Sequence, residues 1–386
     1  MGIINNPMSD RSRITTLDGV RGIAIIMVLF HHVVLTSGLI ATNFTEKVIS
    51  MIGAFSRTGV DLFFILSGFL ITGILIDAKG TPRYYQSFYF RRILRIFPLY
   101  YLFLFLIFFM WPILSKYFWF IKNISVDRIW YWLYLANFKM FFDNIVPSLI
   151  ISHIWSLCIE EQFYLFWPLI VGLVSIKNLP RIIIGIIFLG LSVRVLLDGI
   201  YHCSAWQIRV FTFARLDIIG LGGLLAVLYR KNSFNGFFPS KPEKICFILL
   251  IVTGLIAIAF KILTGYYLFK SDTFFYTEVE ILYIGVMVAS LMSIENSILH
   301  KMLSSKLLMN FGKYSYSIYL FHLPLCAIFS NTIFRYLKTC SSSPIILLGM
   351  FFAITLVISF GIGCFTYHFY EKYFLKLKDI VAPIVV

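Results

Sequence analysis

An arginine and a histidine share one face of the first long apolar stretch of the chain. Arg21 and His32 lie eleven residues apart between Leu17 and Leu39. At about 100° per residue, eleven steps bring both side chains onto one stripe of a helix, roughly 16 Å apart along its axis. His31 lies roughly 80° off that stripe. Because ionisable groups within hydrocarbon normally face a polar interior, the spacing predicts a polar channel with His32 deep inside it as a proton-transfer group.

Two adjacent carboxylates mark a later apolar stretch. Glu160 and Glu161 diverge by about 100° on a helix, and Glu161 shares a face with Tyr164. Pro168 follows and is expected to kink this helix. In a structural interpretation, one carboxylate is solvated at the membrane interface and the other pairs with an arginine. In the functional interpretation, Glu161 lies in the polar cavity, where it orients His32 or contributes to the acceptor site.

Three arginines open another apolar stretch. Arg92 and Arg95 share a helix face, and Arg95 lies deeper, followed by an Ile-Phe-Pro run. Arg91 is typical of the positive charge that marks a cytoplasmic boundary. Guanidinium groups bind phosphate through two parallel hydrogen bonds. A phosphorylated donor that approaches from the cytoplasm is therefore expected to meet Arg92 and Arg95 first.

A polar cluster near the C-terminus precedes Pro324. Ser315 and His322 are seven residues apart and share a helical stripe, with Tyr316 and Tyr319 close by. Two interpretations remain open. Small and polar side chains join helices within membranes, or Ser315, Tyr316 and His322 contribute to substrate binding.

Further charges fall within apolar stretches and suggest ion pairs. Arg57 and Asp61 are four residues apart and could pair with each other. Arg215 and Asp217 are two residues apart, so on a helix they are expected to reach different partners.

Several familiar catalytic motifs are absent from the sequence. It contains no G-x-S-x-G elbow, P-loop, dinucleotide-binding fingerprint or H-E-x-x-H motif. None of its six cysteines forms a C-x-x-C pair, so neither a disulfide framework nor a bound metal is expected. The remaining chemistry, an intramembrane histidine with arginine and glutamate groups, suits general-base transfer of a group from a phosphorylated carrier to a hydroxyl.

The composition predicts an all-α, polytopic transmembrane helix bundle. Of 386 residues, 60% are hydrophobic and only 13% are charged, against about 25% charged in soluble domains. The mean hydropathy is +0.88. No stretch is polar enough for a second soluble domain, so residues 1–386 are expected to form a single integral-membrane domain. The ten predicted spans are 17–39, 50–76, 93–114, 153–175, 181–200, 211–229, 245–263, 274–293, 315–336 and 345–369.

The distribution of positive charge predicts the topology. Lysine and arginine concentrate in one set of alternate loops, and such loops are cytoplasmic. Both termini are therefore predicted to be cytoplasmic. The net charge of +15 is explained by this asymmetry, so anionic lipid headgroups are expected partners and nucleic acid is not.

The longest region between spans, residues 115–152, is predicted to lie on the outer side. Its aromatic residues include Trp119, Trp130, Trp132 and Tyr134, a composition suited to the membrane interface. It is interpreted either as a simple aromatic anchor or as one or two interfacial helices that cover a substrate entrance.

Five segments together resemble the acyltransferase-3 family of integral membrane acyltransferases. They are Leu-Asp-Gly-Val-Arg-Gly-Ile-Ala at 17–24 with Phe-His-His at 30–32, Gly-Val-Asp-Leu-Phe-Phe-Ile-Leu-Ser-Gly-Phe-Leu at 59–70, Arg-Arg-Ile-Leu-Arg-Ile-Phe-Pro at 91–98, Trp-Ser-Leu through Glu-Glu-Gln-Phe-Tyr at 155–164, and Ser-Tyr-Ser-Ile-Tyr-Leu-Phe-His-Leu-Pro at 315–324. They occur in the family's order and extend over most of the chain.

The resemblance implies O-acylation, commonly acetylation, with acetyl-CoA or another acyl-CoA as co-substrate. The family's Arg-x10-His pattern matches Arg21 and His32, which the resemblance makes catalytic together with Glu161. Its Arg-x-x-Arg pattern matches residues 92 and 95, and its Glu-x-x-Tyr-x-x-x-Pro pattern matches residues 161, 164 and 168. Glu371 is followed by Lys-Tyr without the family's proline, so it is assigned no role. The chain is expected to be a stand-alone member in a bacterial plasma (inner) membrane.

The expected acceptor is a carbohydrate or glycolipid: O-antigen, capsule, exopolysaccharide, peptidoglycan or a secreted small molecule. His32 either deprotonates the acceptor hydroxyl or first accepts the acyl group as a nucleophile. Two other classes remain: a secondary transporter, which also has intramembrane charges, and a non-catalytic glycolipid-binding membrane protein. The oligomeric state is left open by the sequence.

Overall fold

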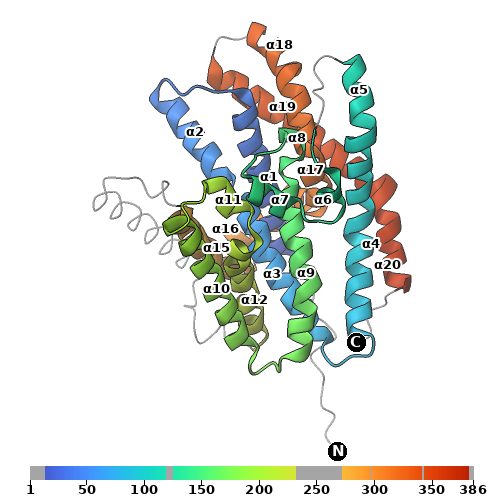
Figure 1. The fold of residues 1–386 in the computed structure, drawn as a ribbon. Coiled ribbons are helices and arrows are strands. Elements are labelled where there is room, and N and C mark those ends of the chain that lie inside the picture. Colours follow the sequence, from blue (N-terminus) through green and yellow to red (C-terminus); the bar gives the residue numbers. More distant parts are fainter. Residues whose placement is uncertain (1–13, 119–124, 232–271, 296, 341–342, 382–386) are drawn as a thin grey trace, which may run out of the picture.

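The computed structural model describes residues 14–118, 125–231, 272–295, 297–340 and 343–381, and every regular element in these ranges is a helix (Figure 1). The elements are α1 (Thr15–Ser37), α2 (Phe44–Ser56), α3 (Gly59–Ala78), α4 (Tyr84–Phe105), η1 (Leu106–Met110), α5 (Trp111–Tyr117), α6 (Arg128–Trp132), α7 (Ala136–Asp143), α8 (Leu149–Ser152), α9 (Ile154–Leu173), α10 (Leu179–Gly199), α11 (Ala205–Val210), η2 (Thr212–Arg215), α12 (Leu216–Arg230), α15 (Asp272–Leu291), α16 (Ile298–Leu303), α17 (Lys306–Asn331), α18 (Ile333–Cys340), α19 (Pro344–Thr366), η4 (Tyr367–Glu371) and α20 (Lys372–Val381). The predicted polytopic helix bundle is confirmed.

Seven helical stretches of the described chain are long and apolar enough to cross a membrane. They are Thr15–Ser37, Phe44–Ala78, Tyr84–Tyr117, Leu179–Gly199, Thr212–Arg230, Lys306–Thr339 and Pro344–Lys378. Two further predicted spans, 153–175 and 274–293, correspond to the helices α9 and α15. The predicted span 245–263 lies outside the described residues. The count of ten spans and the cytoplasmic termini stay predictions.

The helices α1 and α17 pack closely at the centre of the bundle because glycines remove the side chains between them. A Cβ atom at Gly22 would collide with the main-chain carbonyl of Leu308, and one at Gly312 would collide with the carbonyl of Asp18. This close approach places the polar residues of α17 beside those of α1.

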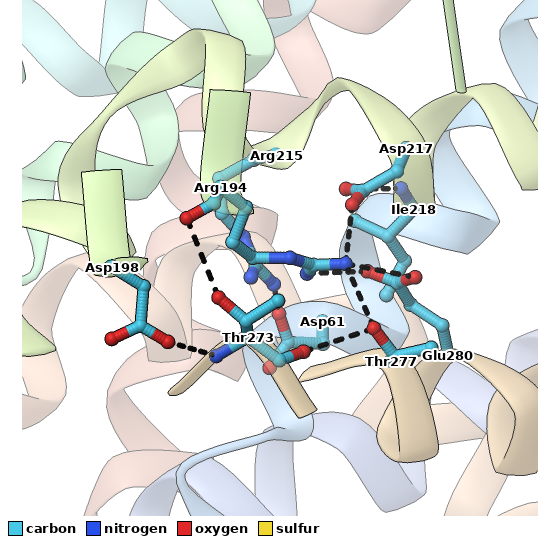
Figure 2. Close-up of polar contacts among 9 residues, drawn as sticks. All are labelled: Asp61, Arg194, Asp198, Arg215, Asp217, Ile218, Thr273, Thr277 and Glu280. Carbon is cyan, nitrogen blue, oxygen red and sulfur yellow. Dashed lines mark hydrogen bonds and ion pairs between the residues drawn. The ribbon is translucent and has the colours of Figure 1, made fainter. Parts of the chain in front are cut away.

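Five charged side chains pair with one another in a group that we call the buried charge cluster (Figure 2). Its members are Asp61 of α3, Arg194 of α10, Arg215 of η2, Asp217 of α12 and Glu280 of α15. The Arg194 guanidinium lies 2.6 Å from an Asp217 oxygen and 2.8 Å from a Glu280 oxygen, and Arg215 pairs with Asp61. Both arginines are fully buried.

The buried charge cluster joins four parts of the bundle that are distant in sequence. Arg215 also lies over the ring of Tyr276, 4.1 Å from its centroid, and the main-chain N–H of Ile218 donates to Asp217 over 2.9 Å. Arg215 and Asp217 therefore have different partners, as their spacing predicts. Asp61 forms its ion pair with Arg215 across the bundle, whereas the sequence suggested a local pair with Arg57.

The region between α5 and α9 packs against α9 through short helices. Three of them, α6, α7 and α8, are described where one or two interfacial helices were expected. The Gln162 amide of α9 donates to the main-chain oxygen of Tyr134 and to the Asn137 side chain, each over 2.9 Å. In Figure 1, α9 lies between α10 and α12 on one side and α4 and α20 on the other. The region thus lies beside the helix that carries the paired carboxylates.

Candidate active site

A polar cavity of about 100 Å³ lies between α1, α3, α4, α9 and α17. It has room for several water molecules or a small acyl group. Seven of the nine residues predicted for the site line it: Arg21, Arg92, Arg95, Glu161, Tyr164, Ser315 and Tyr316. Four separate helices, α1, α4, α9 and α17, therefore bring these side chains to one place.

The cavity's charges are poorly matched by protein partners. The guanidinium of Arg92 lies over the Tyr164 ring, 5.4 Å from its centroid, and Arg21 lies 3.5 Å from Asp18. Within the described ranges, Arg92, Arg95 and Glu161 form no salt bridge with another residue. Charges held in a bundle without partners need water or a ligand, so this cavity is suited to binding a charged substrate.

Tyr164 connects the two sides of the polar cavity. Its hydroxyl donates to a Glu160 carboxylate oxygen over 3.2 Å and shares a hydrogen bond with Ser67 of α3. Glu160 and Ser67 both line the cavity, yet neither was selected from the sequence. The signal for Glu160 was present in its adjacency to Glu161, but helical geometry alone could not show that both carboxylates reach one cavity.

His32 and His322 lie outside the polar cavity and contact each other. The His322 Nε2 atom is 3.1 Å from His32 Nδ1, which also lies 2.9 Å from the main-chain oxygen of Val28. His322 Nδ1 is 2.6 Å from the main-chain oxygen of Tyr319. Arg21 and His32 thus both face α17, but the predicted common channel reaches only Arg21 in this structure.

The hydrogen bonds determine which nitrogen atoms carry protons when both rings are neutral. A carbonyl oxygen only accepts, so His322 Nδ1 must donate to Tyr319, and His322 Nε2 is then an acceptor. His32 Nδ1 is consequently the donor to both Val28 and His322. This tautomer leaves His32 Nε2 unprotonated, which is the state that a general base requires.

Tyr319 lies between the polar cavity and the histidine pair. It lines the cavity, and its ring centroid is 5.4 Å from the ring centroids of both His322 and His153. Its hydroxyl lies 2.5 Å from Ser156 Oγ and donates to the main-chain oxygen of His153 over 3.1 Å. His153, a buried histidine to which the sequence assigned no role, therefore belongs to the same polar group.

Metal ligands do not gather in the described part of the chain. No group of three or more His, Cys, Asp or Glu side chains there has a geometry that could hold a metal ion. The polar groups around the cavity are arginines, carboxylates, hydroxyls and imidazoles, which are the groups of acid–base and anion-binding chemistry.

The helical bundle with a charged internal cavity defines a multi-pass membrane protein with a reaction or transport site. A family model described as an acyltransferase domain matches residues 14–364. The chain therefore belongs to the acyltransferase-3 family, as the five segments indicated. No solved structure matches the chain.

Three curated relatives are named as established or putative bacterial O-acetyltransferases. The chain is 31% identical over 333 residues to the peptidoglycan O-acetyltransferase OatA of Listeria monocytogenes, covering 82% of this chain and 50% of the relative. It is 29% identical over 375 residues to the putative peptidoglycan O-acetyltransferase YrhL of Bacillus subtilis, covering 92% and 54%. A putative O-acetyltransferase of Staphylococcus aureus is 28% identical over 326 residues, covering 79% and 49%. The chain spans about half the length of these relatives.

Proposed function

We propose that the protein is an O-acetyltransferase of the bacterial plasma membrane that moves an acetyl group from acetyl-CoA to a hydroxyl of a cell-surface carbohydrate. The observation that carries this proposal is the polar cavity, in which Arg92 and Arg95 have no salt-bridge partner among the described residues. Peptidoglycan is the first acceptor to test because two relatives are named for it. O-antigen, capsule and exopolysaccharide are the alternatives.

The arginines of the cavity are suited to the donor. Acetyl-CoA carries several phosphate groups, and guanidinium groups bind phosphate with two parallel hydrogen bonds. In the proposed arrangement Arg95 binds the donor phosphates at the cytoplasmic mouth, Arg92 lies beside it where the cavity borders α9, and Arg21 assists deeper in the cavity. The polar cavity, with Ser315 and Tyr316 in its lining, then has room for the thioester.

His32 is proposed to act on the acceptor hydroxyl. Its Nε2 atom takes the hydroxyl proton as the oxygen attacks the thioester carbonyl carbon, the carbon–sulfur bond breaks, and the sulfur leaves as the CoA thiolate. The proton on His32 then passes to the thiolate or to water. In the second route, Nε2 itself attacks the carbonyl and expels the CoA thiolate. The acceptor hydroxyl then attacks the acyl group on histidine, which frees Nε2, and the hydroxyl proton passes to the thiolate or to water. In both routes Glu161 contributes negative charge beside the acceptor.

Movement of Tyr319 is required to join the two parts of this site. The tyrosine lies between the cavity that would hold the thioester and the His322–His32 pair. Rotation of its side chain would cost the short hydrogen bond to Ser156 but would open a path between them.

The first test is the rate of acetyl transfer in the variant His32→Ala. Because general-base catalysis contributes about 10²–10⁴-fold, we expect a loss of that size. His31→Ala is the matched control, since His31 is adjacent on α1 but hydrogen-bonds to Gly53 instead of His322. Transfer is measured with radiolabelled acetyl-CoA and purified protein in detergent, where transport cannot contribute to the signal.

A cellular measurement identifies the acceptor. Proton NMR spectra of surface glycans are compared between cells that carry the wild-type protein, the variant His32→Ala at matched expression, and no copy. O-acetyl signals that require His32 would support the proposal. Equal losses in the His31 and His32 variants would contradict the assigned base, and identical spectra with no transfer by the purified protein would contradict the function.

A further inference from the structure

A second cavity adjoins the polar cavity and opens to the side of the bundle. This apolar groove has a volume of about 690 Å³, within the range of about 300–1,000 Å³ that is typical of ligand pockets. Its walls come from α4, α7 and the turn before it, α9, α10, η2 and α12. Its lining includes Ile93 and Phe97 of α4, Leu133 in the turn, and Leu165 and Phe166 of α9.

The exposed apolar residues that line the groove indicate that its mouth faces the membrane. Ile93, Leu165 and Phe166 are 39%, 55% and 60% exposed, on helices whose outer faces are apolar. Polar cavities hold ordered water, but apolar ones do not. An apolar groove that opens on hydrocarbon is therefore suited to a hydrocarbon chain.

The groove shares a wall with the polar cavity. Arg92, Glu161 and Tyr164 line both spaces. At this junction the Arg92 guanidinium packs over the Phe88 and Tyr164 rings, at 5.7 and 5.4 Å from their centroids. Within the described residues it forms no salt bridge. A cation that forms no salt bridge thus stands where the apolar space meets the reaction cavity.

We propose that the groove binds the acceptor in lipid-linked form, with its hydrocarbon chain along α4 and α9, its phosphate at Arg92 and a hydroxyl of its saccharide directed to the polar cavity. This inference rests on the proposed acetyl transfer and adds the substrate class: a saccharide attached to a membrane lipid through phosphate. Each part of that molecule matches one part of the surface, namely the apolar groove, the cation and the polar cavity.

The position of the opening favours the acceptor over the donor as the occupant. A long acyl chain on CoA has the same chemistry, a phosphate with a hydrocarbon chain. However, a soluble donor enters from water and does not need a mouth among membrane-exposed residues such as Leu165 and Phe166. A lipid-linked acceptor diffuses within the bilayer and can enter only through such a mouth. The groove also extends to Leu133, in the region that the charge pattern predicts on the outer side.

The experiment compares two bulky substitutions on the membrane face. Ile93→Trp fills the groove, whereas Leu169→Trp adds the same side chain at a residue that is 43% exposed on α9 and lines neither cavity. The probes are N-acetylglucosamine joined through phosphate to a dodecyl chain, and N-acetylglucosamine phosphate without the chain. Binding is measured by native mass spectrometry in the absence of acetyl-CoA, and KM is then measured in the transfer assay.

We expect the wild-type protein to bind the dodecyl probe more tightly than the chainless one. Ile93→Trp should weaken binding of the dodecyl probe and raise its KM about tenfold or more, corresponding to about 1.4 kcal/mol. The KM for the chainless probe and for acetyl-CoA should stay unchanged, and Leu169→Trp should change none of these values. Elution as a monodisperse peak verifies that both variants fold.

The possible results distinguish a failure of the lipid site from a failure of the proposed acetyl transfer. Equal binding of the two probes by the wild-type protein, or unchanged binding in Ile93→Trp, would overturn the inference. A KM that rises in Ile93→Trp for dodecanoyl-CoA but not for the lipid-linked probe would assign the groove to the donor chain and overturn it too. If the dodecyl probe binds in the groove but neither probe is acetylated, the lipid site stands and the proposed function fails.

Discussion

The polar cavity and the buried charge cluster use the same residue types for opposite purposes. In the cluster, Arg194 lies within 2.8 Å of two carboxylates, and Arg215 pairs with Asp61. In the cavity, Arg92 and Arg95 form no salt bridge within the described residues, although Glu161 lines the same space. The charges of the cluster pair with one another and join helices, while those of the cavity remain able to bind a ligand.

The difference lies in burial and in the salt bridges that the charges form. Arg194 and Arg215 are fully buried, so their desolvation must be offset by nearby carboxylates and by the ring of Tyr276. The Arg21 side chain retains 28% exposure in the structure. Ionisable residues in a membrane protein therefore cannot be assigned to function by residue type alone; their partners decide.

The largest expected effect is on stability, from breaking the closed cluster. Asp61→Leu leaves the buried Arg215 without its carboxylate, and removal of one partner of a buried ion pair costs about 3–5 kcal/mol. The double variant Asp61→Leu with Arg215→Met should recover most of that loss, because it removes both charges. Thermal unfolding of the purified protein measures both variants. Glu161→Gln, in the open cavity, should leave the unfolding midpoint unchanged; a loss equal to that of Asp61→Leu would erase the distinction between the two regions.

A smaller effect is expected on donor binding, from the open cavity. Arg95→Ala removes hydrogen bonds to a charged group, worth about 1.5–3 kcal/mol, so the KM for acetyl-CoA should rise about ten- to hundredfold while folding is retained. Arg91→Ala serves as the control, since Arg91 does not line the cavity. Steady-state kinetics with varied acetyl-CoA measures both. An unchanged KM in Arg95→Ala would argue against a phosphate-binding role.

The smallest effect, on kcat, is expected at the His32–His322 pair, which is joined by a hydrogen bond and not by a salt bridge. His322→Ala removes one hydrogen bond that orients His32, worth about 0.5–1.5 kcal/mol. We expect kcat to fall about two- to tenfold with the donor KM unchanged. His322→Gln, whose amide can still accept a hydrogen bond, should restore part of the rate. Loss of folded protein in the alanine variant, or no rescue by glutamine, would make His322 structural.

Much of the fold followed from local sequence properties. Length, apolar composition and 3.6-residue periodicity predicted the helical bundle, and most predicted spans coincide with described helices. Hydropathy was less informative for α9 and α15, whose polar residues face the interior of the bundle. The second predicted span, 50–76, is divided in the structure between α2 and α3.

Most residues that line the polar cavity could also be predicted, but the separation of His32 from that cavity could not. Spacing selected Arg21, Arg92, Arg95, Glu161 and Tyr164, all of which line the polar cavity. The same reasoning placed His32 in one channel with Arg21. The structure instead separates them by Tyr319, because the ring of that residue on α17 lies between the cavity and His322.

The sequence by itself determined the class of protein, the family and the residues that can do chemistry, since these depend on composition, periodicity and short segments. Only the tertiary structure decided which charged side chains form buried salt bridges and which line a cavity without one. Asp61 and Arg215 meet although they lie more than one hundred residues apart, and no helical spacing encodes such a contact. The apolar groove beside Arg92 likewise arises from helices that are distant in sequence. Packing between helices, guided by glycines such as Gly22 and Gly312, supplies that information.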